Sequence, residues 1–303
     1  MVSAIQLAYN GLAFGSVIVL AAMGLSLLYG IGNFANFAHG ELLTVGAYLT
    51  LLLYGAVGLP FVLAAVVSVG LAVALGVLID RGLMVHHRQS SSLTLLLITV
   101  GVAFILRSLI RIVWSSSPRS YGLPLVVDQQ VLDSTVTVAG YDVVLSLGVS
   151  GKSLAIIAVG ILAATGVHLF LTRTKTGVAM RATSANRSLS KVTGIDTEYV
   201  ATTTWAVAAG LAALSGVVLA YSSGVIYPRM GFDVLLVVFA AVVLGGIGSP
   251  YGAMVGAYVI SIAREFSVLI PGVGSRYKLA VAFLVMIVVL LFKPEGIYGG
   301  KWS

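Results

Sequence analysis

The residues best suited to bind a polar solute lie in one short segment, residues 33–41, between two long apolar stretches. The segment carries two carboxamides, Asn33 and Asn36, one imidazole, His39, and one carboxylate, Glu41. Such side chains are too polar to face lipid, and an ionisable group at membrane depth indicates a functional site by default. As a group they could line a cavity that binds a solute. Individually they could instead satisfy backbone groups that are freed where a helix is interrupted.

Glu41 itself has two interpretations. It is the only acidic residue that precedes Asp80. A carboxylate just after a break can neutralise the positive end of a helix dipole, or it can act on a solute or a coupling ion. Metal binding at His39 is not expected, because no cluster of Cys, His or carboxylate at ligand spacing surrounds it.

A second break, at residues 245–252, interrupts the apolar sequence of the other half. Gly245, Gly246 and Gly248 have no reactive side chain, so we expect them to permit close approach or positive φ. The segments that follow the two breaks are near-copies, Thr44-Val45-Gly46-Ala47-Tyr48-Leu49 and Met254-Val255-Gly256-Ala257-Tyr258-Val259. Paired interruptions in two related halves indicate a transport path, because unwound backbone survives at membrane depth only where it lines a cavity.

The composition excludes a water-soluble fold. Of the 303 residues, 59% are hydrophobic and only 9% are charged, against about 25% charged in an ordinary soluble domain. With roughly 20 apolar residues per span, we predict one all-α polytopic membrane domain, 1–303, with about eight or nine transmembrane helices. The predicted spans are 5–28, 42–57, 61–79, 93–113, 153–171, 199–221, 233–244, 253–268 and 279–292. The chain contains no cysteine, which excludes disulfides and thiolate metal sites.

The charged residues indicate an orientation in the membrane. The net charge is +7, and basic residues gather in 80–90, 173–198 and the C-terminal tail, whereas 115–152 is more acidic than basic. The positive-inside rule places the first three regions inside and 115–152 outside, with the N-terminus outside and the C-terminus inside. These basic connections suit anionic membrane lipid and a cytoplasmic partner, so no nucleic acid is expected. Within the external region, the alternating residues 131–144 predict a small β-hairpin.

Two arginines do not fit this charge bias. Arg107 and Arg111 lie one helical turn apart, toward the outer end of the span 93–113. We expect both side chains to extend to the outer interface, as long cationic side chains do near helix ends. Contact with an anionic group of a solute is the alternative.

The basic connection 173–198 contains an amphipathic pattern. The spacing of its apolar residues predicts one helix over 177–192, which Gly194 would end. The apolar stripe consists of Val178, Ala182, Ala185, Leu189 and Val192. Periodicity leaves open whether this helix lies on the lipid headgroups or docks in a groove of a soluble partner.

Several of these segments resemble one family, the permease subunits of branched-chain amino acid ABC importers. The likeness runs from about residue 6 to residue 300 and is more specific for the family than for the solute. The similar segments are 36–41 with 46–48, 174–177 with 180–182 and 194–195, 239–249 with Gly252, Ala253 and Gly256, and 291–299 with Glu265.

The resemblance implies a multi-pass protein of the cell membrane that translocates leucine, isoleucine and valine by alternating access. Separate cytoplasmic ABC ATPase subunits would hydrolyse ATP, so this chain would be no enzyme and would need no cofactor. A second permease subunit, identical or homologous, and an extracytoplasmic solute-binding protein complete the implied assembly. The expected path residues are Asn33, Asn36, His39, Glu41, Gly245, Gly246 and Gly248, and the expected ATPase-coupling residues are Gly177, Val178, Arg181, Ala182, Ala185, Leu189 and Gly194.

Three other functions compete with this hypothesis. A close variant carries urea or a short amide instead of an amino acid. A self-sufficient secondary transporter would use Glu41 to couple a proton or cation, although the membrane segments contain few charges. A purely structural scaffold is disfavoured, because packing alone does not require two broken helices.

Overall fold

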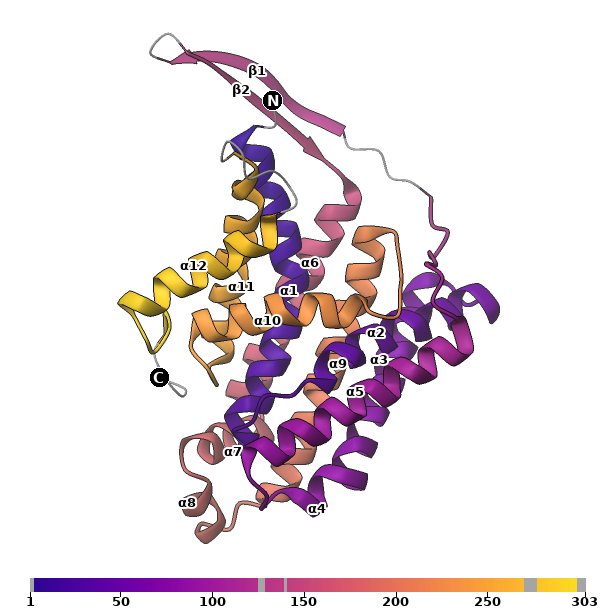
Figure 1. The fold of residues 1–303 in the computed structure, drawn as a ribbon, viewed down its shortest axis with the longest axis vertical. Coiled ribbons are helices and arrows are strands. Elements are labelled where there is room, and N and C mark those ends of the chain that lie inside the picture. The colour runs from indigo at the N-terminus through magenta and orange to yellow at the C-terminus, as the bar shows by residue number, and fades with distance from the viewer. Residues whose placement is uncertain (1–2, 125–128, 139–140, 270–276, 299–303) are drawn as a thin grey trace.

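The computed structural model describes residues 3–124, 129–138, 141–269 and 277–298, and most of them are helical (Figure 1). The all-α fold class is therefore confirmed. The helices are α1 (Ala4–Gly32), α2 (Ala38–Leu51), α3 (Phe61–Ile79), α4 (Val85–His87), α5 (Ser92–Trp114), α6 (Gly151–Arg173), α7 (Lys175–Ala185), α8 (Arg187–Val192), α9 (Thr197–Ser223), α10 (Met230–Gly245), α11 (Pro250–Phe266) and α12 (Lys278–Phe292). Short π-helical turns, Leu52–Ala56 and Asp80–Met84, extend α2 and α3, and a 3-10 turn, Ser267–Leu269, extends α11.

Six helical stretches among the described residues are long and apolar enough to cross a membrane. They are Ala4–Gly32, Phe61–His87, Ser92–Trp114, Gly151–Arg173, Thr197–Ser223 and Pro250–Leu269. Two shorter apolar helices, α10 and α12, accompany them. The predicted ranges lie on these helices and on α2, with ends that differ by a few residues. A long apolar run predicts that a helix is present, but it does not specify the residues at which the helix begins and ends.

The predicted β-hairpin is present and is longer than 131–144. Strands β1 (Gln129–Val138) and β2 (Tyr141–Val149) pair antiparallel, and Val138 lies opposite Tyr141. Before the hairpin, the chain is held on the helical body, since the backbones of Arg119 and Ile226 exchange two hydrogen bonds. The segment before the hairpin is thus tied to the loop that joins α9 and α10.

Helices α1 and α9 form the centre of the fold, and each packs on the helix that follows the break of the other half. Helix α11 packs along α1, and α2 packs along α9. The two central helices also contact each other, where the Ser215 hydroxyl of α9 donates to the Val17 carbonyl of α1 at 2.8 Å. They carry similar sequences, Ser16-Val17-Ile18-Val19-Leu20-Ala21 and Ser215-Gly216-Val217-Val218-Leu219-Ala220. The two related halves are therefore interlocked, not laid side by side.

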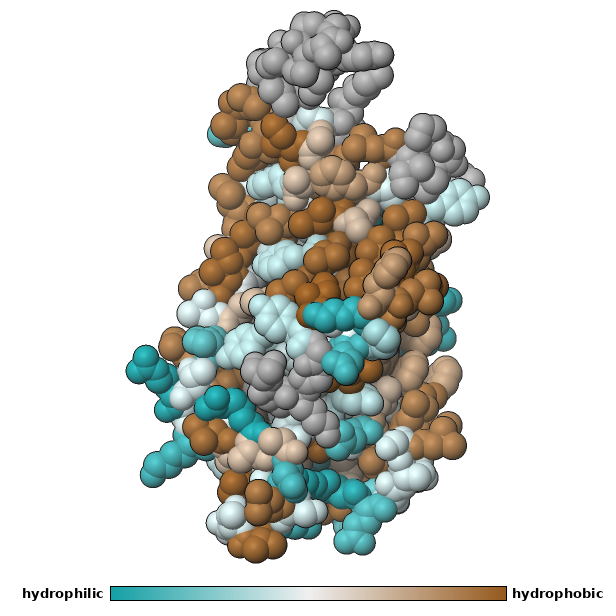
Figure 2. Space-filling model, turned by 90° about the vertical axis from the view of Figure 1, so that its left-hand side faces the viewer, coloured by the Kyte–Doolittle hydropathy of each residue, from teal (hydrophilic) through white to brown (hydrophobic). Residues whose placement is uncertain are grey.

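The molecule has two different ends. The β-hairpin and the N-terminus lie at one end, the hairpin end, and α4, α7 and α8 lie at the other, the α7–α8 end (Figure 1). Helix α10 runs across α1 between them. On the face shown in Figure 2, hydrophobic residues dominate toward the hairpin end and hydrophilic residues gather toward the α7–α8 end. The regions predicted on opposite sides of the membrane, 115–152 and 173–198, thus lie at opposite ends.

Candidate functional site

The first break is a short turn between α1 and α2. Helix α1 is capped by Asn33 in the left-handed conformation, with φ 54° and ψ 34°. Asn36 is fully buried, and its Oδ1 accepts from the backbone N–H of Ala38 at 3.0 Å. The Phe37 N–H donates to Oγ1 of Thr99 on α5 at 3.2 Å. The side chains of Asn36 and Thr99 therefore satisfy part of the backbone that the break leaves free, which for Asn36 is one of the two roles considered from the sequence.

Three buried polar atoms of this segment remain without a hydrogen-bond partner among the described residues. They are Nδ2 of Asn36, Nδ1 of His39 and Oε2 of Glu41. The other ring nitrogen of His39 lies 2.9 Å from the carbonyl oxygen of Ala21 on α1. Buried polar groups are nearly always satisfied in native proteins, so each exception needs an explanation. Three exceptions within six residues indicate a place where a polar ligand or water completes the bonding.

Glu41 forms an ion pair with Arg107 of α5. The Arg107 Nε lies 3.0 Å from Glu41 Oε1, and its Nη2 contacts the same oxygen. The Arg107 side chain is only 12% exposed and its guanidinium lies 4.8 Å from the ring centroid of Phe232 on α10. The expectation that Arg107 extends to the outer interface is therefore wrong, because its guanidinium forms an ion pair with the buried Glu41 carboxylate of α2. Arg111, one turn further, is exposed.

The second break is a tight turn between α10 and α11. Gly246 and Gly248 have φ of 111° and 85°, which favour glycine. A Cβ on Gly245 would lie 2.0 Å from the carbonyl oxygen of Gly252, so the two helices touch through their backbones. The Ser249 hydroxyl caps α11 by accepting from the N–H of Gly252 at 3.1 Å. These three buried glycines have the geometric roles that the sequence suggested.

The two breaks lie close together at the last turn of α1. A Cβ built on Gly248 would be 3.5 Å from the Cα of Gly30, three residues before the first break begins at Asn33. The C-terminal segment also reaches this place, because the N–H groups of Ile297 and Tyr298 donate to the last carbonyls of α10 at 2.8 and 3.1 Å. The last turn of α1 thus brings together two interruptions that lie far apart in the sequence, at 33–41 and 245–252.

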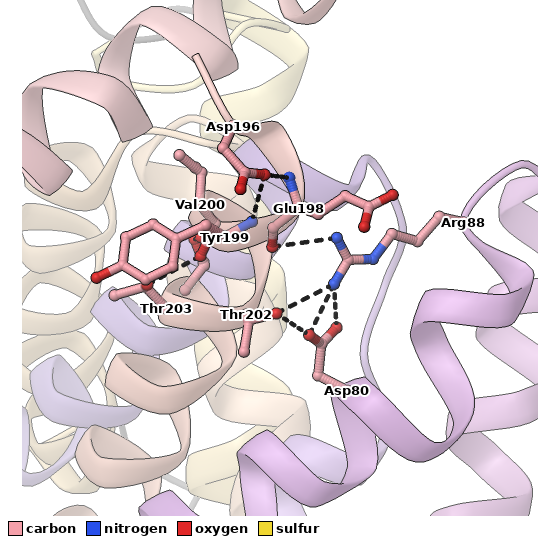
Figure 3. Close-up of polar contacts among 9 residues, drawn as sticks. Asp80, Arg88, Asp196, Glu198, Tyr199, Val200, Thr202 and Thr203 are labelled. Atoms are coloured by element: carbon pink, nitrogen blue, oxygen red, sulfur yellow. Dashed lines mark hydrogen bonds and ion pairs between the residues drawn. The ribbon is translucent and has the colours of Figure 1, made fainter. Parts of the chain in front are cut away.

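An ionic clasp that sequence analysis missed lies toward the α7–α8 end, between α3 and α9 (Figure 3). The Nη2 of Arg88 lies 2.9 and 2.7 Å from the two carboxylate oxygens of Asp80, which is fully buried. The Thr202 hydroxyl of α9 donates to the same carboxylate at 2.6 Å, and Arg88 also reaches the Glu198 carbonyl at 3.2 Å. The sequence signal for this contact was Asp80, an acidic residue directly after the apolar span 61–79.

Replacing Arg88 with glutamine is expected to destabilise the protein by about 2 kcal/mol. The substitution leaves the Asp80 carboxylate buried without its cation, but Thr202 still donates to it, which limits the loss. Thermal unfolding of the purified protein in detergent measures the change. The exposed Arg81→Gln substitution removes the same charge nearby, and an equal effect of both variants would contradict the clasp.

The connection 173–198 holds two helices, not the single helix predicted over 177–192. Asn186 has φ −154° and ψ 101°, which ends α7, and its Oδ1 caps α8 by accepting from the Leu189 N–H at 2.9 Å. The prediction was wrong because an asparagine that caps locally overrides apolar periodicity. Gly177 is buried, and a Cβ there would lie 2.1 Å from the Phe170 carbonyl oxygen, so α7 packs tightly on the end of α6.

Most residues of the predicted apolar stripe face outward. Val178 is 48% exposed, Leu189 is 59% exposed and Val192 is 86% exposed. Of the other expected coupling residues, Ala185 and Gly194 are exposed, and Arg181 and Ala182 are half-buried. Val178, Leu189 and Val192 define what we call the α7–α8 surface. An apolar surface of this kind at a polar end of the molecule is typical of an interaction site.

Comparison with known proteins decides the family. Residues 7–290 match the family model described as branched-chain amino acid transport system / permease component. This chain belongs to that permease family. Similar relatives are the high-affinity branched-chain amino acid transport system permease proteins BraD of Pseudomonas aeruginosa, 31% identical, and LivH of Escherichia coli K12, 32% identical, each over 97% of this chain and 95% of the relative. A probable LivH permease of Methanocaldococcus jannaschii is 30% identical over 97% of this chain and 92% of its own.

The family match confirms the resemblance drawn from the sequence motifs. With the apolar helices, it makes this permease a multi-pass protein of the cell membrane. The relatives are transport components and not enzymes. The described residues contain no group of three or more His, Cys, Asp or Glu that could hold a metal ion.

Proposed function

We propose that this permease forms the membrane path of an ABC importer for branched-chain amino acids. Its partners would be a second permease subunit, cytoplasmic ATPases and an external solute-binding protein. The observation that supports the proposal is the α7–α8 surface, whose three apolar side chains are exposed at the end opposite the hairpin. The hairpin end, with the N-terminus, would be outside, and the α7–α8 end would be inside.

The contacts of α7 suggest how a partner would move the path. Helix α7 touches α6 at Gly177, and α6 touches α1, where a Cβ on Gly160 would lie 2.7 Å from the Cβ of Ser16. A displacement of α7 would therefore shift α6 and then α1, because these helices are in close contact. The last turn of α1 lies between the two breaks. Nucleotide binding by the ATPases must favour one permease state by several kcal/mol to drive such a cycle.

The path would follow the buried polar segment of the first break and the glycines of the second. The unpartnered atoms of Asn36, His39 and Glu41 are groups that a passing solute could bond. The ion pair with Arg107 speaks against the alternative of a secondary transporter, because Arg107 already balances the negative charge that would have to attract a coupling cation. Urea or a short amide remains the competing solute, and uptake with the cognate binding protein distinguishes it.

Introducing charge on the α7–α8 surface is expected to release the ATPase. Val178→Asp together with Leu189→Asp replaces two exposed apolar side chains. Burying each of them against the ATPase would stabilise the complex by about 1.5–3 kcal/mol. Association should therefore weaken at least about a hundredfold. Copurification of the ATPase with tagged permease from membranes measures this.

The control is Val131→Asp, which changes an exposed valine of the hairpin at the opposite end. We expect this variant to retain the ATPase. Full retention by the double variant would overturn the proposed docking site and would favour a helix pair that rests on lipid.

A further inference from the structure

A cavity of about 520 Å³ lies between α1, α9, α10, α11 and α12, where α9 and α11 end. These ends point toward the hairpin end of the molecule (Figure 1). The cavity is neither of the two breaks, and none of the expected path residues lines it. Its lining combines apolar side chains with charged groups of both signs, which is the composition of a site for a small polar ligand.

Two basic residues line this cavity, Arg264 and Lys278, and Lys278 is paired with Glu265, so Arg264 provides the available positive charge. Its guanidinium lies 3.8 Å from the ring centroid of Phe14, which holds it in place. Among the described residues it forms no ion pair, since its neighbour Glu265 is bonded by Lys278 at 2.6 Å. A guanidinium in a partly apolar cavity, whose N–H groups have no acceptor among the described residues, is suited to a carboxylate, which it can bind through two parallel hydrogen bonds.

Asp233 provides the negative charge. It lies in the first turn of α10, and its Oδ1 is 2.9 Å from Nε of Arg229. That pair is exposed, and exposed ion pairs contribute at most about 1 kcal/mol, so an ammonium group can replace the arginine. Tyr227 lines the same wall; burial, and then the neighbouring Asp233 carboxylate, raise the pKa of its phenol, which stays protonated and bonds that carboxylate.

The rest of the cavity is suited to an aliphatic side chain. Leu219, Met230, Val234 and Val237 line it, and none of them carries a polar side-chain group. The helix that carries Asp233 also carries Phe232, whose ring contacts Arg107 of the Glu41 ion pair. The first turn of α10 therefore contacts the cavity with Asp233 and the Glu41–Arg107 ion pair with Phe232.

We infer that this cavity binds one free α-amino acid, with its carboxylate on Arg264, its ammonium on Asp233 and an aliphatic side chain against the apolar wall. This inference rests on the proposed function and adds a specific site to it. The site would receive the solute at the hairpin end before the solute reaches the buried segment of the first break.

The natural absence of cysteine allows a direct test in the intact importer. A Ser222→Cys variant gives this chain one thiol, in the lining of the cavity, and the rate at which maleimide labels this chain, separated by size from its partners, is measured with and without leucine. Leucine is expected to slow the labelling. Leucinamide, which lacks the carboxylate, and 4-methylpentanoate, which lacks the ammonium, are expected to protect about tenfold more weakly.

Substitutions in the Ser222→Cys variant test the two charges separately. With Arg264→Gln added, leucine and leucinamide should protect the thiol equally. With Asp233→Asn added, leucine and 4-methylpentanoate should protect it equally. Arg111→Gln, an equal loss of charge outside the cavity, should change neither preference. If a variant fails to fold, the three ligands on the Ser222→Cys protein still decide the matter.

The possible failures are distinguishable. Equal protection by leucine and leucinamide, or no protection while the same importer takes up leucine, would overturn the amino-acid site and leave the proposed function intact. An importer that is assembled with its ATPase and binding protein but takes up no branched-chain amino acid would overturn the proposed function itself.

Discussion

Replacing Arg107 with glutamine is expected to destabilise the permease by about 3–5 kcal/mol. The substitution leaves the fully buried Glu41 carboxylate without a cation, and no other hydrogen-bond partner of that carboxylate is found among the described residues. The loss should appear as a lower unfolding temperature in detergent and as a lower yield of folded protein from membranes. Arg111→Gln, at an exposed position one turn away, should leave both quantities nearly unchanged.

The double variant Glu41→Gln with Arg107→Gln separates stability from transport. Removing both charges avoids an isolated buried ion, so we expect most of the lost stability to return. If the pair also serves the path, uptake by the reconstituted importer should stay low although the protein is folded. A double variant that transports normally would show that the pair acts only in folding, and would remove Glu41 from the proposed path.

The positions of the helices could be predicted from the sequence because the membrane leaves few alternatives. Apolar runs of sufficient length must form helices there, since lipid satisfies no backbone hydrogen bonds. The range predicted for the third helix, 61–79, coincides with α3. The two breaks could be located for the same reason, because polar or glycine-rich residues interrupt runs that otherwise continue.

Partners across the fold could not be predicted in this way. Glu41 and Arg107 are 66 positions apart, and nothing in either segment specifies which faces of α2 and α5 meet. The clasp of Asp80 with Thr202 spans 122 positions. Such contacts depend on how helices cross, and crossing is set by small residues spread over the whole chain.

Local competition explains the error in the connection 173–198. The apolar stripe there has a helical period, but Asn186 offers a side-chain oxygen to the N–H of Leu189, and that cap starts a new helix. The stripe was still informative, because its residues Val178 and Leu189 lie exposed on the two helices. The periodicity thus picked out residues that are mostly exposed, although it gave the wrong number of helices.

Glycines at the crossings of α2 should be as important for stability as the charge pair. Helix α2 carries His39 and Glu41, and it lies between α9 and α10. A Cβ on Gly216 of α9 would lie 1.8 Å from the carbonyl oxygen of Leu43, and a Cβ on Gly231 of α10 would lie 1.8 Å from that of Gly40. Both obstacles are backbone atoms, which cannot move aside by changing a rotamer.

We therefore expect Gly216→Ala and Gly231→Ala each to cost about 3 kcal/mol, the upper part of the usual range for overpacking. The rate of uptake should fall by more than the loss of folded protein explains, because transport requires α2 to shift together with the buried polar segment at its start. Unfolding temperature and uptake of the reconstituted importer measure the two effects.

Gly70→Ala and Gly166→Ala are the matched controls, since nothing lies within 4 Å of a Cβ at either position. Alanine there should be neutral or stabilise its helix by about 0.5–1 kcal/mol. If the crossing variants behaved like these controls, α2 would not be held by backbone contact. Because α2 carries the charged end of the first break, a loose α2 would also leave Glu41 without a fixed place opposite Arg107.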